Sequence, residues 1–202
     1  MAQRRHHYER AFEEYLRARR IPYVAVDEAR KALLPEGAAF RHAGESLKSF
    51  DFVVYGDGLN LLVDIKGRKV IRRRTASPTS AGRLETWVTS EDVGSLQLWQ
   101  GLFGSQFQAA FVFVYWCDEQ PPDALFDEVF EFRGRWYVLR AVRLTDYIAN
   151  MRTRSVRWKT VHVPTAQFER ISQPLAEAPD RVLTVGQSAP GVGDVEGADP
   201  AS

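Results

Sequence analysis

The sequence predicts a single α/β domain in which helices flank a mixed, partly antiparallel sheet. Three patterns predict this class: a helical repeat near the N-terminus, a β-hairpin between Ser49 and Lys66, and a second helix leading into an apolar strand between Glu91 and Trp116. A chain of 202 residues, 45% of them hydrophobic, can bury one sizeable core. We expect the domain to cover residues 1–175 and the stretch 176–202, rich in Ala, Pro, Gly and acids, to be a disordered tail.

The first helix is predicted between Tyr8 and Arg19, where large side chains recur at the three- and four-residue spacing of one helical face. The segment is closed by Ile21-Pro22, because proline marks a helix boundary. Glu9 lies beside the apolar stripe, and Glu13 lies one turn further along the same side.

The hairpin is predicted from two short apolar runs, Val53–Tyr55 and Leu61–Ile65, separated by Asp57-Gly58. Asp-Gly is a preferred pair for a two-residue type I′ turn, which fixes the register of the strands beside it. If Gly56 faces Leu59, each earlier residue of the first strand has a defined partner on the second.

The remaining elements follow the hairpin. A helix is expected over Glu91–Phe103, stopped by Gly104, and then a central strand over Ala109–Trp116. Added C-terminal elements are expected to decorate the core: a hairpin with its turn at Arg133-Gly134, a short helix over Leu144–Met151 and a strand over Val156–Val163. Their tryptophans, Trp136 and Trp158, are interpreted as packing residues.

Two carboxylates and one amine stand out within the hairpin. The predicted register places Asp51 opposite Asp64, with their Cβ atoms roughly 4.5 to 5.5 Å apart, and Lys66 leaves the strand from the same face as Asp64. Two carboxylates this close repel each other unless a cation neutralises part of their charge. Their hard oxygen atoms are suitable ligands for Mg²⁺ or Mn²⁺. The arrangement favours metal-dependent phosphodiester hydrolysis. A salt bridge between Asp64 and Lys66 at a strand end is the alternative.

These residues resemble the signature of the PD-(D/E)xK nuclease superfamily, which includes archaeal Holliday-junction resolvases and many restriction enzymes. Asp51 precedes Asp64-Ile65-Lys66 by 64 − 51 = 13 positions, although Phe50 stands where the motif has proline. The resemblance implies a restriction-endonuclease-like core and a Mg²⁺- or Mn²⁺-dependent endonuclease. It assigns the metal to Asp51, Asp64 and the carbonyl of Ile65, and it makes Lys66 the catalytic amine.

The same resemblance suggests further site residues. In this superfamily an acid on the preceding helix often completes the site, a role that falls on Glu9, with Glu13 as the competitor. Several branches also carry a glutamine on the helix after the motif, which corresponds to Gln97. The alternatives are solvated helix charges for the acids and an exposed side chain for the glutamine. Resolvase-like members are commonly dimeric, so a homodimer is compatible with the resemblance.

Basic residues gather in two parts of the chain although the net charge is only +1. Clusters that flank a metal site favour a nucleic acid, most simply DNA, as the partner. The candidate nucleic-acid contacts are Lys48, Arg68, Lys69, Arg72, Arg73, Arg74, Arg152, Arg154, Arg157 and Lys159.

The sequence lacks the patterns of several other classes of protein. Cys117 is the only cysteine, which excludes an internal disulfide and a cysteine-based zinc site. The chain shows neither a leader-type segment nor a membrane-length apolar run, so we expect a cytoplasmic protein without a membrane partner. Two further hypotheses stay open beside the nuclease. One is a nucleic-acid-binding module that keeps the fold without turnover, and the other is a purely structural protein.

Overall fold

The structure is a computed structural model that describes residues 3–26, 41–42, 45–46, 48–56, 59–70, 84–118 and 128–175. Its helices are α1 (Gln3–Ala18), α3 (Ser90–Phe103), α4 (Leu144–Asn150) and α5 (Thr165–Ile171). Its strands are β1 (Tyr23–Ala25), β2 (Arg41–His42), β3 (Glu45–Ser46), β4 (Phe52–Val54), β5 (Asn60–Lys69), β6 (Trp87–Thr89), β7 (Phe107–Cys117), β8 (Val129–Phe132), β9 (Arg135–Arg143), β10 (Arg152–Ser155) and β11 (Thr160–His162). Within these ranges, none of the helices has the length and apolar character needed to cross a bilayer.

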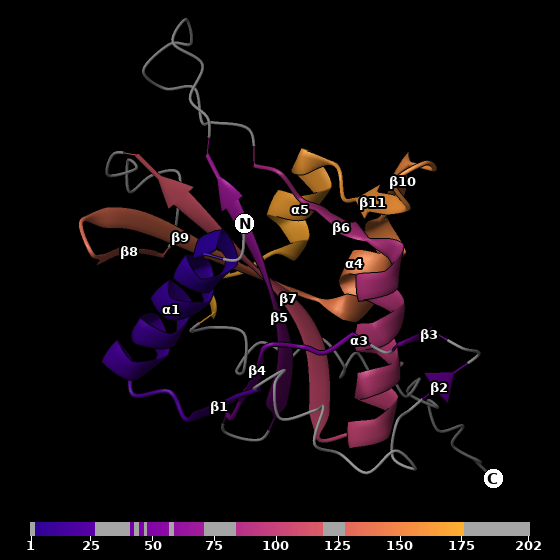
Figure 1. The fold of residues 1–202 in the computed structure, drawn as a ribbon, viewed down its shortest axis with the longest axis horizontal. Coiled ribbons are helices and arrows are strands. Elements are labelled where there is room, and N and C mark those ends of the chain that lie inside the picture. The colour runs from indigo at the N-terminus through magenta and orange to yellow at the C-terminus, as the bar shows by residue number, and fades with distance from the viewer. Residues whose placement is uncertain are drawn as a thin grey trace, which may run out of the picture.

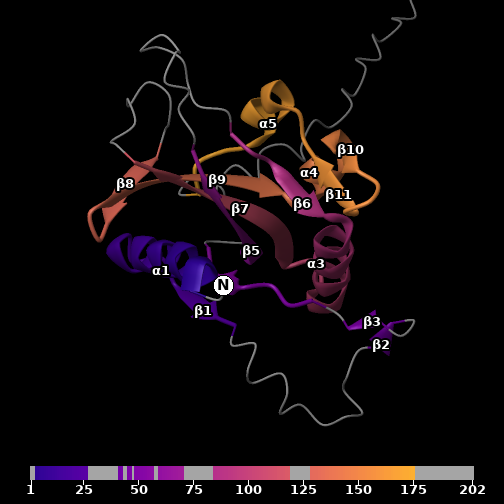
Figure 2. The same ribbon diagram turned by 45° about the horizontal axis from the view of Figure 1, so that its top comes forward.

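A six-stranded sheet in the order β1-β4-β5-β7-β9-β8 forms the centre of the fold. The pair β5 and β7 is parallel, and the other neighbours in this sheet are antiparallel. Figures 1 and 2 show α1 over one face of the sheet and α3 with α4 over the other. This architecture confirms the predicted fold class, a mixed sheet flanked by helices. The expected order of helix, hairpin, helix and central strand is present as α1, β4–β5, α3 and β7.

Strand β5 sends alternate side chains to the two faces of the sheet, as a strand must. Leu61 and Val63 belong to the core beneath α1, together with buried residues of that helix. Leu62 belongs to the other core, which α3, α4 and α5 cover. Asp64 and Lys66 continue the row of Leu62, so two charged side chains occupy a face that is otherwise packed against α3.

Helix α3 is held at both ends by local signals in the sequence. At its start, Thr89 and Asp92 form a reciprocal capping box: the Asp92 amide donates to Thr89 Oγ1 over 3.1 Å and the Thr89 amide donates to Asp92 Oδ2 over 2.9 Å. At its end, Gly104 adopts a φ of 81°, a conformation that favours glycine. The predicted helix and its stop are confirmed, and β7 confirms the predicted central strand.

The C-terminal elements agree with the sequence in part. The β8–β9 hairpin turns at Arg133-Gly134, where both residues have positive φ, as a type I′ turn requires. The strand expected over Val156–Val163 is wrong over its first half, because residues 156–159 form a turn and β11 begins only at Thr160. Strands β10, β11 and β6 form a separate three-stranded sheet beside α3.

The two tryptophans of this region differ in environment. Trp136 packs against the core, as predicted. The packing interpretation is wrong for Trp158, whose side chain in the turn after β10 is 69% exposed. The turn Asp57-Gly58 and the expected tail 176–202 lie outside the described residues.

Candidate active site

The predicted hairpin register is confirmed along the described strands. Phe52 pairs with Val63, and the next two residues of β4 pair with Leu62 and Leu61. The chain then bends at Asp51, whose carboxylate Oδ2 accepts a hydrogen bond of 2.6 Å from the backbone amide of Ile65. Asp51 therefore extends the ladder with its side chain in place of a backbone carbonyl, which holds its carboxylate beside the end of the Asp64-Ile65-Lys66 segment.

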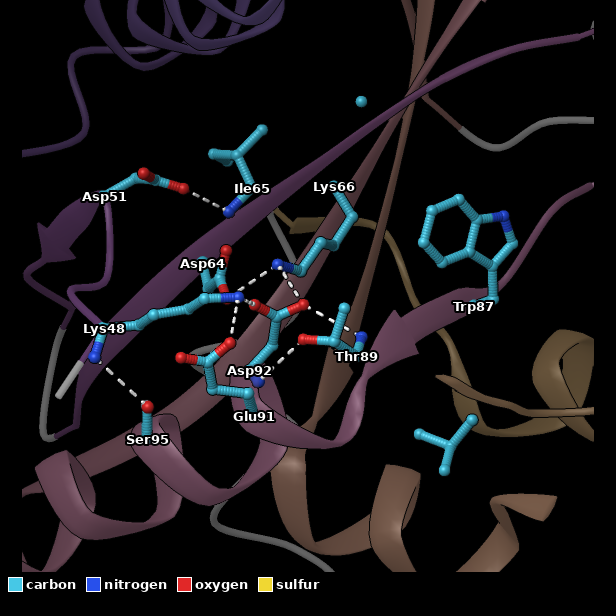
Figure 3. A network of polar contacts seen from close by, with 12 residues as sticks. Lys48, Asp51, Asp64, Ile65, Lys66, Trp87, Thr89, Glu91, Asp92 and Ser95 are labelled. Carbon is cyan, nitrogen blue, oxygen red and sulfur yellow. Dashed lines mark hydrogen bonds and ion pairs between the residues drawn. The ribbon is translucent and has the colours of Figure 1, made fainter. Parts of the chain in front are cut away.

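Lys66 stands between two carboxylates from different elements, as Figure 3 shows. Its Nζ lies 3.0 Å from Oδ2 of Asp64 on the same strand and 3.1 Å from Oδ2 of Asp92 on α3. All three side chains are largely buried, with between 12% and 13% of each exposed. Charge-assisted hydrogen bonds with little exposure to water are stronger than surface ion pairs. Lys66 is thus fixed in position from two sides.

The network continues to a second lysine. Lys48 Nζ lies 3.1 Å from the other oxygen of Asp92 and 2.8 Å from Glu91 Oε2, and the Lys48 amide donates to Ser95 Oγ over 3.3 Å (Figure 3). Acid and ammonium groups therefore alternate from Asp64 to Glu91. The nucleic-acid contact of Lys48 stays a prediction, and in the structure its ammonium group pairs with two acids in the first turn of α3.

The pKa values of Asp64 and Asp92, the two largely buried acids of this network, are shifted in opposite directions. Burial raises the pKa of Asp64 to about 7, the carboxylates of Asp51 and Asp92 act in the same direction, and Lys66 opposes them. Burial also acts to raise the pKa of Asp92, but Lys66 and the hydrogen bonds with Thr89 outweigh it and lower the value to about 2. Asp92 is thus firmly anionic, whereas Asp64 lies near its titration point at neutral pH. An acid with a perturbed pKa in a cluster of charges is a candidate for a functional group, although structural ion-pair networks also shift pKa values.

The donor set suits a hard divalent cation. Asp51, Asp64 and the Ile65 carbonyl offer oxygen atoms alone. Burial, and after it the neighbouring carboxylates, raise the pKa of Asp64, and a bound cation would favour its charged form. Within the described part of the chain, no group of three or more His, Cys, Asp or Glu side chains is placed to hold a metal ion. A metal here would therefore be held by two carboxylates and a carbonyl, with water or substrate supplying the other ligands.

The helical residues that the resemblance suggested lie elsewhere. Glu9 is half-buried on α1, which packs on the face of the sheet opposite to Asp64 and Lys66. Its competitor Glu13 accepts hydrogen bonds from Arg17 over 2.7 Å and from Tyr23 over 2.9 Å, as the solvated-charge alternative predicts. These contacts engage Glu13 within α1 and with β1, and the role suggested for Glu9 stays a prediction.

Helix α3 carries two glutamines, and their environments differ. Gln97 is exposed, and it is Gln100 whose Oε1 accepts a hydrogen bond of 2.7 Å from the Ala109 amide at the start of β7. The residue that α3 brings to Lys66 is Asp92.

The basic residues predicted to contact nucleic acid fall into different environments. Arg68 is largely buried, donates to the carbonyls of Gly67 and Trp87 and stacks over the Trp87 ring, so it is a packed guanidinium and not a surface contact. Lys69 is exposed and pairs with Asp118 at 3.0 Å. Exposed side chains on and after β10 are Arg152, Arg154, Arg157 and Lys159. The other three, Arg72, Arg73 and Arg74, lie outside the described residues.

Sequence reasoning missed Asp92 and Glu91 as partners of the lysines. A signal was present, because Thr89 followed three residues later by an acid is a capping pattern that predicts the start of a helix. That pattern places Asp92 in the first turn of α3. It does not reveal that this turn lies against β5, since only the packing of the whole domain brings the two together.

The chain was compared with family models, with curated protein sequences and with solved structures. No family model and no curated protein sequence matches this chain. Among solved structures, it is similar to Hjc from Archaeoglobus fulgidus, a Holliday junction resolvase from an archaeal hyperthermophile, with a TM-score of 0.48 and 12% sequence identity over 86% of this chain and 98% of that one.

Proposed function

We propose that this protein is a Mg²⁺- or Mn²⁺-dependent endonuclease that hydrolyses phosphodiester bonds in DNA. The observation that carries the proposal is the convergence of Asp51, Asp64 and Lys66 at one end of the β4–β5 pair: the Asp51 carboxylate accepts from the Ile65 amide, and Lys66 pairs with Asp64. Two acids and an amine at this spacing resemble the PD-(D/E)xK pattern, from which the chain departs at Phe50. The raised pKa of Asp64 supports the proposal, because a buried acid whose charged form is disfavoured by desolvation and by neighbouring carboxylates is a candidate for a functional group.

In this proposal each group has a distinct role. Asp51, Asp64 and the carbonyl of Ile65 hold the divalent ion, which when bound supplies charge neutralisation for the phosphate and acidifies a water molecule. Lys66 places its ammonium group beside the attacked phosphate and donates hydrogen bonds where negative charge develops. Asp92 contacts neither the divalent ion nor the phosphate in this proposal. It acts as a positioning residue, because its carboxylate holds the Lys66 Nζ at 3.1 Å.

Cleavage assays test the proposal directly. Linear, branched and single-stranded DNA of equal length should be incubated with Mg²⁺, with Mn²⁺ and with EDTA, using the wild-type chain, Lys66→Ala and Asp64→Asn. We expect divalent-dependent cleavage that falls by about 10²-fold or more in either variant. The matched control is Arg10→Ala, an exposed cation on α1 that should cleave like the wild type. Equal cleavage by Lys66→Ala and the wild type would reject the proposed role of Lys66.

A nucleic-acid-binding module without turnover is the second candidate, and one observation favours it. Lys66 is engaged by two carboxylates and Lys48 by two, so every acid of the network from Asp64 to Glu91 already has an ammonium partner. This candidate predicts salt-sensitive DNA binding, no cleavage with either ion and no loss of binding in Asp64→Ala. The assays above, combined with binding in EDTA, separate the two.

A further inference from the structure

The turn between β10 and β11 exposes two large apolar side chains at one point of the surface. Val156 is 84% exposed and Trp158 is 69% exposed, the highest values among the large hydrophobic residues that the structure describes. A single exposed apolar residue needs no explanation, but tryptophan is enriched at interfaces, because its ring combines a large apolar surface with an N–H donor. Residues 152–159 contain four basic side chains and no acid.

The aromatic and basic groups of this hairpin are in contact with one another. The Arg157 guanidinium lies 5.3 Å from the centre of the Trp158 ring, and both side chains are exposed. A flat apolar ring beside cations is the combination that single-stranded nucleic acid requires, because bases stack on the ring while cations neutralise phosphates.

A row of cation–aromatic contacts joins the hairpin to the candidate active site. Arg154 of β10 lies over the ring of Trp87 at 5.1 Å, and Arg68 of β5 lies over the same ring at 4.1 Å. Arg68 follows Lys66 by two residues on the same face of β5. Beside Trp87 and Arg154 lies an open pocket of about 320 Å³, also lined by His162 and Thr165. Basic and aromatic groups thus extend from the site towards the hairpin, together with one acid, Glu85, which pairs with Arg154 at 3.7 Å and lines the same pocket.

The turn is tied rigidly to the helix that carries Asp92. The amide of Ser90, the first residue of α3, donates a hydrogen bond of 2.8 Å to the carbonyl of Lys159, and Thr160 pairs with Thr89. Lys159 has a φ of 45°, and its amide closes the turn on the carbonyl of Val156 over 3.2 Å. A preformed turn loses little conformational entropy when it binds a partner.

We propose that this turn binds unpaired nucleotides of the nucleic-acid substrate, with Trp158 stacked on a base and Arg157 and Lys159 against the neighbouring phosphates. The inference rests on the proposed nuclease function and names its substrate class: a strand with at least one unstacked base beside the cleaved bond. Anionic lipid is disfavoured as the occupant, because the row of cations and rings leads from the turn to the Lys66 site and not over an apolar surface.

Binding without cleavage tests the inference. Fluorescently labelled single-stranded DNA and a duplex of the same length should be titrated in EDTA at three salt concentrations with the wild type, Trp158→Ala, Trp158→Phe and Val156→Ala. Trp158→Ala should weaken single-strand binding on the order of 10-fold with an unchanged salt slope, since tryptophan releases no counterions. Trp158→Phe should retain most of the affinity, and Val156→Ala serves as the matched control at the same turn. Arg157→Gln should reduce the salt slope by about 1.

Three outcomes overturn the inference: equal single-strand affinity of Trp158→Ala and the wild type, equal losses for single strand and duplex, or a Trp158-dependent affinity for phosphatidylserine vesicles without an effect on DNA. Equal thermal unfolding midpoints of Trp158→Ala and the wild type would show that the variant keeps the fold. The two proposals fail separately. Absence of cleavage with a Trp158-dependent preference for single strands rejects only the nuclease, whereas cleavage without that preference rejects only the role of the turn.

Discussion

The ammonium group of Lys66 on β5 and the carboxylate of Asp92 on α3 lie 3.1 Å apart across the interface between strand and helix. Asp92 also closes the capping box of α3 with Thr89, so one carboxylate both starts the helix and holds the lysine. The position of Lys66 therefore depends on how α3 begins. This relationship leads to the first prediction.

Replacing Asp92 with asparagine should reduce DNA cleavage without unfolding the chain. Asparagine keeps an oxygen that can accept from the Thr89 amide, but it removes the charge that holds Lys66. We expect a decrease of roughly 10- to 100-fold in the cleavage rate, as is usual when a group that orients a metal-site residue is removed. The control Thr89→Ala weakens the cap at a cost of about 1 kcal/mol and should leave cleavage nearly intact. A larger loss of cleavage in the control would show that Asp92 acts only through the helix.

The stability of the metal-free protein should fall as pH rises from about 4 to about 7, and Asp64 should be responsible. Burial raises the pKa of Asp64 from 3.8 to about 7, so the folded state binds this proton more tightly than the unfolded state. The associated stabilisation is complete below the unfolded pKa and is lost as pH passes the folded pKa, with a slope of at most roughly 1.4 kcal/mol per pH unit.

Urea unfolding in EDTA at several pH values measures this slope. Asp64→Asn should flatten it and should be as stable as the wild type, or more stable, at pH 8. The control Asp118→Asn changes an exposed acid and should keep the wild-type slope. Marked destabilisation of Asp64→Asn at pH 8 would instead identify Asp64 and Lys66 as a structural ion pair.

Gly67 should not tolerate alanine, whereas Gly94 should. A Cβ atom added at Gly67 would overlap the ring of Tyr8, which packs α1 against β5, while one added at Gly94 on α3 meets nothing within 4 Å. Gly67→Ala should cost about 1–3 kcal/mol through overpacking. Gly94→Ala should add about 0.5–1 kcal/mol, because alanine is the better helix former. Denaturant midpoints of the two variants give the comparison, and equal midpoints would contradict it.

Glu128 should be essential for attaching the segment after α5 to the rest of the fold. This buried carboxylate accepts hydrogen bonds from the Tyr15 hydroxyl and from the Leu175 amide, the latter over 3.0 Å, and lies 3.4 Å from Arg19. Glu128→Ala leaves these donors without their acceptor and should destabilise the protein by about 3–5 kcal/mol. The control Glu131→Ala, an exposed acid on β8, should change unfolding by less than about 0.5 kcal/mol. Similar unfolding curves for the two variants would show that Glu128 is dispensable.

The parts of the fold that could be predicted are those set by local signals. The β4–β5 register agrees with the one expected from the Asp57-Gly58 turn pattern and a side-chain period of two, and α3 follows from its caps at Thr89 and Gly104. The pairing of Lys66 with Asp92 depends instead on how α3 lies on the sheet. No local pattern contains that information.

The error at Trp158 has a different physical origin. Tryptophan in an alternating apolar segment is normally buried, so Val156–Val163 was interpreted as a packed strand. The chain instead turns at residues 156–159, with Lys159 in a positive-φ conformation that sequence patterns rarely predict for lysine. The exposure of Trp158 is thus a consequence of the turn, and it is visible only in three dimensions.

The alternation of β5 also limits how this chain can change in length. Its odd-numbered residues pack beneath α1 and its even-numbered residues carry the acid, the amine and the stacked guanidinium. Deleting or inserting one residue between Leu61 and Lys66 would turn Ile65 towards Asp92 and press a carboxylate against Phe12. Single substitutions in this strand affect one face at a time. A one-residue change in length would exchange the two faces, and would therefore disrupt the hydrophobic core and the candidate site together.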